Sequence, residues 1–297
     1  MSGSHVGVVG LGAMGRALSE SLIAADHAVA VWDRHADRVA TTAMIGASPS
    51  VSPRQLGEQC SVVFLALPNP TAVREVLLDG ETGLLAGLAE NALIIDMTTG
   101  DPALADEITA AVSELRRGIR YVDAPVSGKA PRLTVLVGGR DGVLGDAEEI
   151  VRDVAASIIY TGQLGDGFAT KLVHQHVKYA THLAVSEALL IAQRSGLDVG
   201  VVIEALRSST GVEGGFDGAV EYYAGNARAI AKHAPATTID KDLVMAQALA
   251  EAAGVPSATL EVTARFFGDA IQGEYAKRPY PEASALLAER AASTQSR

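Results

Sequence analysis

The chain has 297 residues, of which 48% are hydrophobic and 20% charged, a composition that excludes wholesale disorder and leaves room for two domains. Its 24 Lys and Arg residues against 35 Asp and Glu residues give a formal net charge of −11. An acidic surface repels the phosphates of nucleic acids and anionic membranes, so we expect neither as a partner.

The first predicted unit is a strand, a glycine-rich turn, a helix and a second strand. Apolar runs over 6–9 and 28–32 predict the strands, and the spacing of the apolar residues over 16–25 predicts the helix between them. Residues 10–15 form the turn. This order is that of a βαβ unit.

Further strands and helices alternate along the first half of the chain. Apolar runs predict strands over 62–67, 93–96, 121–124, 134–137 and 158–161, and helical spacing predicts helices over 37–43, 72–77, 102–115 and 147–155. This alternation predicts an α/β fold with a mostly parallel, doubly wound sheet that is covered by helices on both faces.

The pattern changes after about residue 163. Residues 167–195 have helical spacing without a strand-like run, and Gly196-Leu197-Asp198 predicts a helix stop followed by a new start. The remainder alternates helical stretches with Gly or Pro breaks. We therefore predict an α/β domain over residues 1–163 and an all-helical domain over residues 164–297.

The turn of the first βαβ unit matches the pattern G-x-G-x-x-G, with Gly10, Leu11, Gly12, Ala13, Met14 and Gly15. In this context the motif indicates a Rossmann-type dinucleotide site: Gly10 allows the tight turn, Gly12 leaves room for the pyrophosphate and Gly15 allows close packing of helix on strand. The free N–H groups of the helix N-terminus would face the phosphates.

The second strand ends at Asp33, and Arg34 follows directly. An acid at this position hydrogen-bonds the ribose hydroxyls of NAD, whereas an arginine can hold the 2′-phosphate of NADP. The alternative for Arg34 is a solvated loop cation. The sequence does not decide between the cofactors, and we predict use of either.

Several motifs in order resemble one known family, the β-hydroxyacid dehydrogenases. These are Gly10–Gly15, Asp123-Ala124-Pro125-Val126-Ser127-Gly128, Gly165-Asp166-Gly167 with Lys171, and Lys241-Asp242-Leu243. The family includes 3-hydroxyisobutyrate dehydrogenase and tartronate semialdehyde reductase, with 6-phosphogluconate dehydrogenase and the imine reductases as more distant relatives. The resemblance covers nearly the whole chain.

The resemblance implies a role for individual residues. Lys171 matches the catalytic lysine, Ser127 and Gly128 match the residues that receive the substrate carboxylate, and Lys241 matches a lysine near the nicotinamide end of the cleft. Positions that match the lining of the cofactor cleft are Leu67, Pro68, and Thr98 or Thr99. The implied activity is hydride transfer between NAD(P)H and a small β-hydroxy acid or the matching semialdehyde.

The chemistry of the reaction agrees with a lysine at position 171. Carbonyl reduction delivers a hydride to carbon and a proton to oxygen, and the proton donor needs hydrogen-bond reach and a suitable pKa. A lysine in a partly desolvated cleft can have a lowered pKa, and its charge stabilises a developing alkoxide. The alternative for Lys171 is a surface lysine.

The chain departs from the family at two places. Members usually carry an asparagine pair three and four positions after the lysine, where this chain has His174 and Gln175. His174 lies one helical turn from Lys171 and either relays a proton or fills space as a hydrogen-bonded histidine. The loop after Ser127-Gly128 is also short and carries Lys129 and Arg132, which either favour an anionic substrate or point to solvent.

Other functions stay open at this point. Imine reductases share the architecture but usually lack the lysine that Lys171 matches, and loss of the asparagine pair also fits a cofactor-binding sensor or scaffold without turnover. We expect no metal site, and the family implies a homodimer or homotetramer. Cys60 is the only cysteine, and we expect it to be a buried structural thiol. The start of the chain has no signal pattern, and no apolar run reaches about 18 residues, so we expect a cytoplasmic protein.

Overall fold

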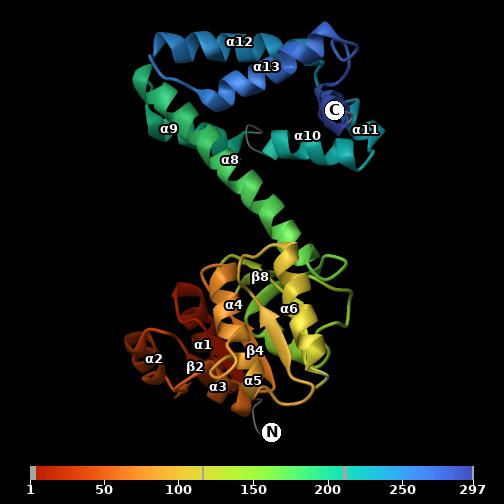
Figure 1. The fold of residues 1–297 in the computed structure, drawn as a ribbon. Coiled ribbons are helices and arrows are strands. Elements are labelled where there is room, and N and C mark those ends of the chain that lie inside the picture. Colours follow the sequence, from red (N-terminus) through yellow and green to blue (C-terminus); the bar gives the residue numbers. More distant parts are fainter. Residues whose placement is uncertain (1–4, 116, 210–212, 296–297) are drawn as a thin grey trace. The chain divides into compact units, whose positions relative to one another are not determined.

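The computed structural model describes residues 5–115, 117–209 and 213–295, and the chain divides into two compact units, Met1–His176 and Val177–Arg297 (Figure 1). Helix α8 (Asp166–Arg194) belongs to both units, because its first turns lie in the first unit and the rest in the second.

The first unit contains a six-stranded sheet in the order β3-β2-β1-β4-β5-β6. All of its strand pairs are parallel; for example, Val8 of β1 pairs with Val31 on one side and with Phe64 on the other. The strands are β1 (His5–Val9), β2 (Ala28–Trp32), β3 (Ser48–Pro49), β4 (Val62–Leu65), β5 (Leu93–Asp96) and β6 (Arg120–Asp123). This is the doubly wound order of dinucleotide-binding domains, and the predicted fold class is confirmed.

The two faces of the sheet are covered by two separate apolar clusters, because alternate side chains of a strand point to opposite sides. Val62 and Phe64 of β4 belong to the cluster that includes α1 (Ala13–Ala24), whereas Val63 and Leu65 belong to the other. The second cluster draws side chains from α3 (Pro53–Gln59), α4 (Pro70–Leu78), α5 (Leu84–Gly87) and α6 (Pro102–Glu114). Helix α2 (Ala36–Ala43) follows β2.

A small second sheet differs from the expected arrangement. The strands predicted over 134–137 and 158–161 exist, but they form a separate sheet in the order β7-β8-β9. Its strands are β7 (Val126–Ser127), β8 (Leu133–Val137) and β9 (Ala155–Tyr160), with β7 antiparallel to β8. The helix predicted over 147–155 was too long: α7 spans Ala147–Arg152, because residues from Ala155 onward pair with β8.

The second unit is helical, as predicted. Its elements after α8 are α9 (Val199–Ser208), α10 (Glu213–Tyr223), α11 (Ala227–Ile230), α12 (Ala236–Ala252), α13 (Ala258–Gln272), a 3-10 turn (Tyr280–Ser284) and α14 (Ala285–Gln295). The predicted stop and start between α8 and α9 is present: Gly196 has a φ of +76°, and the Asp198 carboxylate accepts the N–H of Gly200 at 2.8 Å.

Candidate active site

The glycine-rich turn joins β1 to α1 with little space to spare. Gly10 has a φ of +90°, and a Cβ atom there would lie 2.5 Å from the Ala66 carbonyl oxygen. A Cβ atom on Gly15 would lie 1.7 Å from the Gly10 carbonyl oxygen, so the close packing expected of Gly15 occurs between helix and turn. Gly12 differs, because a Cβ atom there meets nothing within 4 Å. The turn is therefore tight on its inner side and open at Gly12.

The open side of the turn faces a pocket of about 510 Å³. Helix α1 begins beside it with Gly12 as its N-cap and without a side chain that satisfies the first N–H groups. Such a helix end binds phosphate. The lining includes Gly10, Gly12, Ala13, Met14, Leu67 and Pro68, all predicted cofactor-binding residues. The uncapped start of α1, the lack of side chains at Gly10 and Gly12, and the volume of the pocket together fit a nicotinamide dinucleotide.

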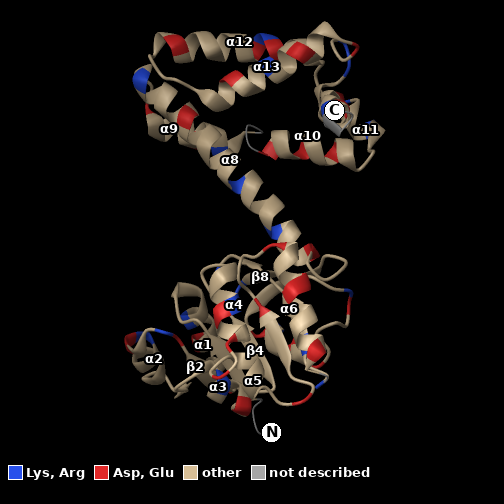
Figure 2. Cartoon of the chain, viewed as in Figure 1, with Lys and Arg blue, Asp and Glu red and all other residues tan. Residues whose placement is uncertain are grey.

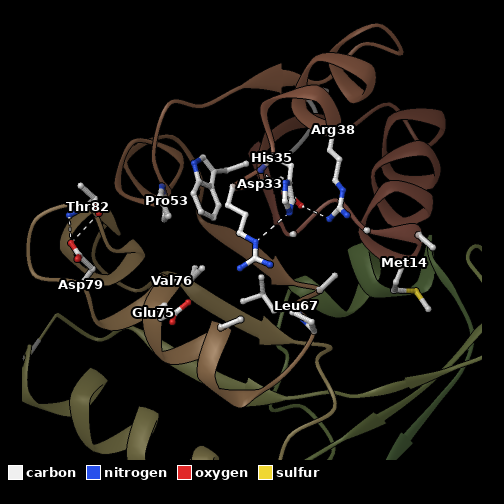
Figure 3. A pocket seen from close by; sticks show the side chains of 18 residues that line it. Met14, Asp33, His35, Arg38, Pro53, Leu67, Glu75, Val76, Asp79 and Thr82 are labelled. Atoms are coloured by element: carbon white, nitrogen blue, oxygen red, sulfur yellow. Dashed lines mark hydrogen bonds and ion pairs between the residues drawn. The ribbon is translucent and has the colours of Figure 1, made fainter.

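Asp33 follows β2 directly and lines the pocket. The buried Asp33 carboxylate accepts the N–H of Leu11 at 2.7 Å and the N–H of His35 at 2.8 Å. Arg38 lies in the first turn of α2 and brings a guanidinium nitrogen to 3.5 Å from the same carboxylate. Figure 3 shows Asp33, His35 and Arg38 gathered on one side of the pocket. The carboxylate therefore has its charge partly balanced before any ligand binds.

Arg34 adds a second cation to this pocket. Its Nε donates to His35 Nε2 at 3.3 Å, and its side chain is exposed. Acidic side chains are spread over both units of the chain (Figure 2), so an anionic ligand depends on local donors of this kind. Glu75 and Asp79 also line the pocket, and Thr82 donates its N–H to Asp79 at 2.7 Å and lowers the pKa of that carboxyl.

The loops after β4 and β5 are joined by a buried hydrogen-bond chain. Leu67 donates its N–H to the Thr98 hydroxyl at 3.1 Å, and Thr98 donates its own N–H to Asp96 at 2.9 Å. The Tyr121 hydroxyl donates to the other Asp96 oxygen at 2.7 Å. Burial raises the pKa of Asp96 to about 6, against the opposing effect of these donors. Thr98 is thereby fixed beside Leu67, whereas Thr99 and Pro68 are exposed.

Lys171 is buried, with 6% of its surface exposed, although it is a cation on the second turn of α8. Lysine is almost never so buried unless it is paired, so its position points to a specific environment. One turn later, His174 Nε2 lies 3.5 Å from the Ser127 hydroxyl oxygen, and its Nδ1 lies 3.2 Å from the Gln175 side-chain oxygen. His174 therefore contacts two other predicted site residues, Ser127 on β7 and Gln175 beside it on α8.

Asp123 connects the segment that leads from β6 to Ser127 with the start of α8. Its carboxylate is buried and accepts the N–H of Gly165 and the N–H of Phe168, both at 2.8 Å. Burial raises the pKa of Asp123, while these two backbone donors oppose the rise. The motif that contains Asp123 was recognised in the sequence, but this role was not, because its partners lie 42 and 45 residues away.

The remaining predicted site residues have different environments. Gly128 follows Ser127 with a φ of +93°, and Lys129 and Arg132 on the same loop are exposed. Lys241 lies on α12 of the second unit, where it is 65% exposed and its Nζ lies 3.2 Å from the Asp242 carboxylate. Its assignment to the cofactor and substrate sites stays a prediction.

Cys60 is buried, as expected, and burial raises its pKa to about 12. Among the residues that the structure describes, no group of three His, Cys, Asp or Glu could hold a metal ion. Within the same residues, no helix is long and apolar enough to cross a membrane.

Some contributing residues were missed or only touched on in the sequence. Trp32 lines the pocket. Asp96 accepts the N–H of Thr98 and the hydroxyl of Tyr121, and so holds the Thr98 backbone in place. Arg38 was visible in the sequence as a second cation close to Asp33, four residues after Arg34 and at the start of the helix predicted over 37–43. Asp96 and Tyr121 gave no such signal, since each forms part of an apolar run in a predicted buried strand.

Both parts of the chain match profiles of known protein domains. Residues 5–162 match the NAD binding domain of 6-phosphogluconate dehydrogenase. Residues 165–283 match the profile described as NAD-binding of NADP-dependent 3-hydroxyisobutyrate dehydrogenase.

Curated relatives carry similar names. The probable 3-hydroxyisobutyrate dehydrogenase-like 1 of Arabidopsis thaliana is 35% identical over 72% of this chain, and the match spans just under two thirds, 64%, of that relative's length. The probable 3-hydroxyisobutyrate dehydrogenase-like 2 of the same plant is 31% identical over 69% of each chain. Both names include the word mitochondrial.

Solved structures share the fold. An imine reductase from Pseudomonas sp. has a TM-score of 0.82 at 19% identity and covers 96% of this chain and 99% of its own. A 3-hydroxyisobutyrate dehydrogenase from Mycobacterium tuberculosis has a TM-score of 0.64 at 23% identity, with the same coverage. At these identities the likeness concerns the fold alone.

Proposed function

Because the chain belongs to the 3-hydroxyisobutyrate dehydrogenase-like proteins of the 6-phosphogluconate dehydrogenase superfamily, we propose that it interconverts a small β-hydroxy acid and its semialdehyde, with Lys171 as general acid and base. The family resemblance inferred from the motifs is confirmed, and NAD(P)-dependent oxidoreductase is the class that it supports. The observation that carries the finer proposal is the burial of Lys171, at 6% exposure, on the helix turns that also bring His174 to Ser127.

The residues of the chain have distinct tasks in this reaction. When bound, a nicotinamide cofactor would supply the hydride for reduction and accept it in oxidation. Lys171 donates a proton from Nζ to the carbonyl oxygen in reduction and accepts the hydroxyl proton in oxidation, and its charge stabilises the alkoxide. Ser127 and Gly128 bind the substrate carboxylate. His174 and Gln175 orient the substrate, in place of the asparagine pair usual in the family.

The proposed substrate carries a negative charge. Lys129 and Arg132 follow Ser127 and Gly128 on an exposed loop, where they would attract a carboxylate, phosphate or sulfonate. One relative at 28% identity is the 3-sulfolactaldehyde reductase of Escherichia coli. Measuring KM for substrates that differ only in their anionic group ranks the carboxylate, phosphate and sulfonate. If the double variant Lys129→Ala/Arg132→Ala keeps the wild-type order of preference, the two cations have no role in recognition.

The proposed cofactor is NADP(H), with NAD(H) also accepted. Arg34 and Arg38 border the pocket on the side of Asp33, and together they offset the repulsion between that carboxylate and a 2′-phosphate. Leu67, Pro68, Thr98 and Thr99 would line the cleft toward the nicotinamide, and Lys241 is proposed to approach its far end.

Removal of the proposed proton donor tests the reaction. Lys171→Ala should lower kcat on the best hydroxy acid by about 100-fold or more, because general acid–base catalysis contributes about 10²–10⁴-fold. Cofactor affinity should change less than threefold, since no proposed cofactor contact is removed. Lys178→Ala on the same helix, where the lysine is exposed, is the matched control and should retain wild-type turnover. Near-normal turnover of Lys171→Ala would falsify the proposal.

A panel of small hydroxy acids and cyclic imines, assayed by cofactor absorbance, also separates two other functions. Imine reduction becomes the better assignment if cyclic imines oxidise NADPH and hydroxy acids reduce no cofactor. A sensor or scaffold role, which the replacement of the asparagine pair by His174 and Gln175 supports, follows if the cofactor binds tightly and no compound of the panel turns over. Retention of a buried Lys171 supports hydroxy acid chemistry over both.

We also propose that the chain forms a homodimer or homotetramer through its helical unit and that it works in the cytoplasm. Support for the assembly comes from the large apolar side chains that α9, α10, α12 and α13 leave exposed. The location needs its own measurement because several relatives are named mitochondrial. Fractionation of cells that express the tagged protein decides it, and enrichment in an organelle contradicts it.

A further inference from the structure

One buried carboxylate lies where the two halves of the proposed catalytic site begin. Asp123 ends β6, and the chain continues from it to Ser127 four residues later. The same carboxylate accepts the N–H of Phe168, three residues before Lys171, and the N–H of Gly165 in the preceding turn. The Asp123 side chain thus connects the segment 123–127 to the first turn of α8, the helix that carries Lys171.

The two segments meet again farther along. His174 Nε2 lies 3.5 Å from the Ser127 hydroxyl oxygen, one helical turn beyond Lys171. The segment from Asp123 to Ser127 and the segment from Phe168 to His174 are therefore joined at both ends. Lys171 lies between these two joints, so its location relative to Ser127 depends on both of them.

The joint at Asp123 has no slack. A Cβ atom on Gly138 would lie 1.9 Å from one Asp123 oxygen, and a Cβ atom on Gly167 would lie 2.8 Å from the other. The backbone N–H of Gly138 also donates to the Asp123 carbonyl oxygen at 2.7 Å. Backbone atoms therefore surround the Asp123 carboxylate on several sides, and only glycine at positions 138 and 167 allows them to come so close.

A carboxylate is suited to this joint for two reasons. Its two oxygens can accept two separate N–H groups, and its negative charge is favourable at the N-terminus of the 29-residue helix α8. An amide of the same shape has one oxygen and an NH₂ group, so it can serve only one of the two donors.

We propose that Asp123 is a positioning residue, which sets the distance between the Lys171 amine and the substrate bound at Ser127. The inference rests on the proposed catalytic role of Lys171. Misplacement of a catalytic group by about 1 Å can lower a rate by about 100-fold, so a joint without slack has a direct effect on turnover.

Asp123→Asn in the full-length, cofactor-loaded protein tests this role. We expect kcat to fall about 10- to 100-fold while KM and cofactor affinity change less than threefold. In the Lys171→Ala background, Asp123→Asn should lower kcat no further, because there is no amine left to misplace. Ethylamine added to Lys171→Ala should restore part of the turnover, and equally so in the double variant, since a free amine does not depend on α8.

The outcomes separate the two proposals. Normal turnover of Lys171→Ala removes the proposed function itself. An inactive Lys171→Ala together with an Asp123→Asn variant that keeps full turnover, or that lowers turnover by the same factor in both backgrounds, overturns only the positioning role.

Two further variants keep the test decisive. Asp198→Asn also alters a carboxylate that accepts backbone N–H groups at a helix start, on α9, and should keep kcat within twofold. If Asp123→Asn does not fold, Gly167→Ala disturbs the same joint, because its methyl group would lie 2.8 Å from the Asp123 carboxylate and 2.5 Å from the Leu136 carbonyl oxygen. It should show the same dependence on Lys171. Equal losses with and without Lys171 would overturn the inference here as well.

Discussion

We propose that three charged side chains after β2, those of Asp33, Arg34 and Arg38, decide which dinucleotide is favoured. Asp33 accepts N–H groups from Leu11 and His35, which leaves its carboxylate held in the pocket and partly neutralised by Arg38 at 3.5 Å. Arg34 is exposed and donates from Nε to His35, so its terminal guanidinium nitrogens are proposed to bind a phosphate. Ribose hydroxyls need Asp33, whereas a 2′-phosphate needs Arg34.

Arg34→Ala should weaken NADPH binding about tenfold or more, because a charge-assisted hydrogen bond contributes about 1.5–3 kcal/mol. NADH binding should change less than threefold. Trp32, the only tryptophan of the chain, lines the pocket, so quenching of its fluorescence measures both affinities. Arg74→Ala, which removes an ion pair with Glu107, is the control and should alter neither affinity. Equal weakening of both cofactors would show that Arg34 contacts a part common to them.

At the scale of elements, the β1–turn–α1 unit separates two demands on glycine. Gly15 is required for packing, since its Cβ atom would lie 1.7 Å from the Gly10 carbonyl oxygen. Gly12 is not required for packing, because a Cβ atom there has open space and the residue has an ordinary φ of −64°. The open space at Gly12 lies where the phosphates approach the start of α1.

The two glycines should therefore fail in different ways when each is replaced by alanine. Gly15→Ala should lower the free energy of unfolding by about 1–3 kcal/mol or more, as overpacking does, and reduce Tm. Gly12→Ala should keep Tm within about 2 °C but weaken NADPH binding by about tenfold or more, equal to about 1.4 kcal/mol. Differential scanning calorimetry and Trp32 fluorescence measure the two effects. A Gly12→Ala variant that binds NADPH normally would contradict the phosphate assignment.

On the scale of the whole molecule, the two units differ in how they use apolar residues. The parallel sheet buries its strands on both faces, whereas the helical unit has small apolar clusters such as Ile191 with Ala250 and Val255. Its helices leave large apolar side chains exposed, among them Val201, Phe216, Tyr223, Met245 and Val262. We propose that these exposed side chains take part in the association of chains.

The protein should therefore have a mass in solution of two or four times 30.6 kDa, which light scattering after size exclusion can measure. Phe216→Glu, at a side chain 60% exposed, should shift the equilibrium toward smaller species because association would bury the added charge. Met44→Glu in the first unit, 86% exposed, is the control and should leave the mass unchanged. A wild-type mass of one chain at micromolar concentration would contradict the assembly.

Much of the fold was determined by short-range patterns. The apolar runs of β1, β2, β4 and β5, the glycine turn and the stop at Gly196 are local, because period, backbone freedom and capping act between near neighbours. These patterns were sufficient for the doubly wound sheet and the helical second half. The family motifs gave candidate site residues, of which the structure brings Ser127, His174 and Gln175 into contact.

Only the tertiary structure decided how distant segments share one site. Asp123 caps a helix whose first residues lie more than 40 positions away, and Asp96 meets Tyr121 across 25 residues of chain. The strands β7, β8 and β9 form a sheet of their own because β8 pairs with both of the others. An apolar run predicts a strand but not the strand with which it pairs. Local preference depends on neighbouring residues, whereas such pairings follow from the packing of the complete chain, which brings remote donors and acceptors within hydrogen-bond distance.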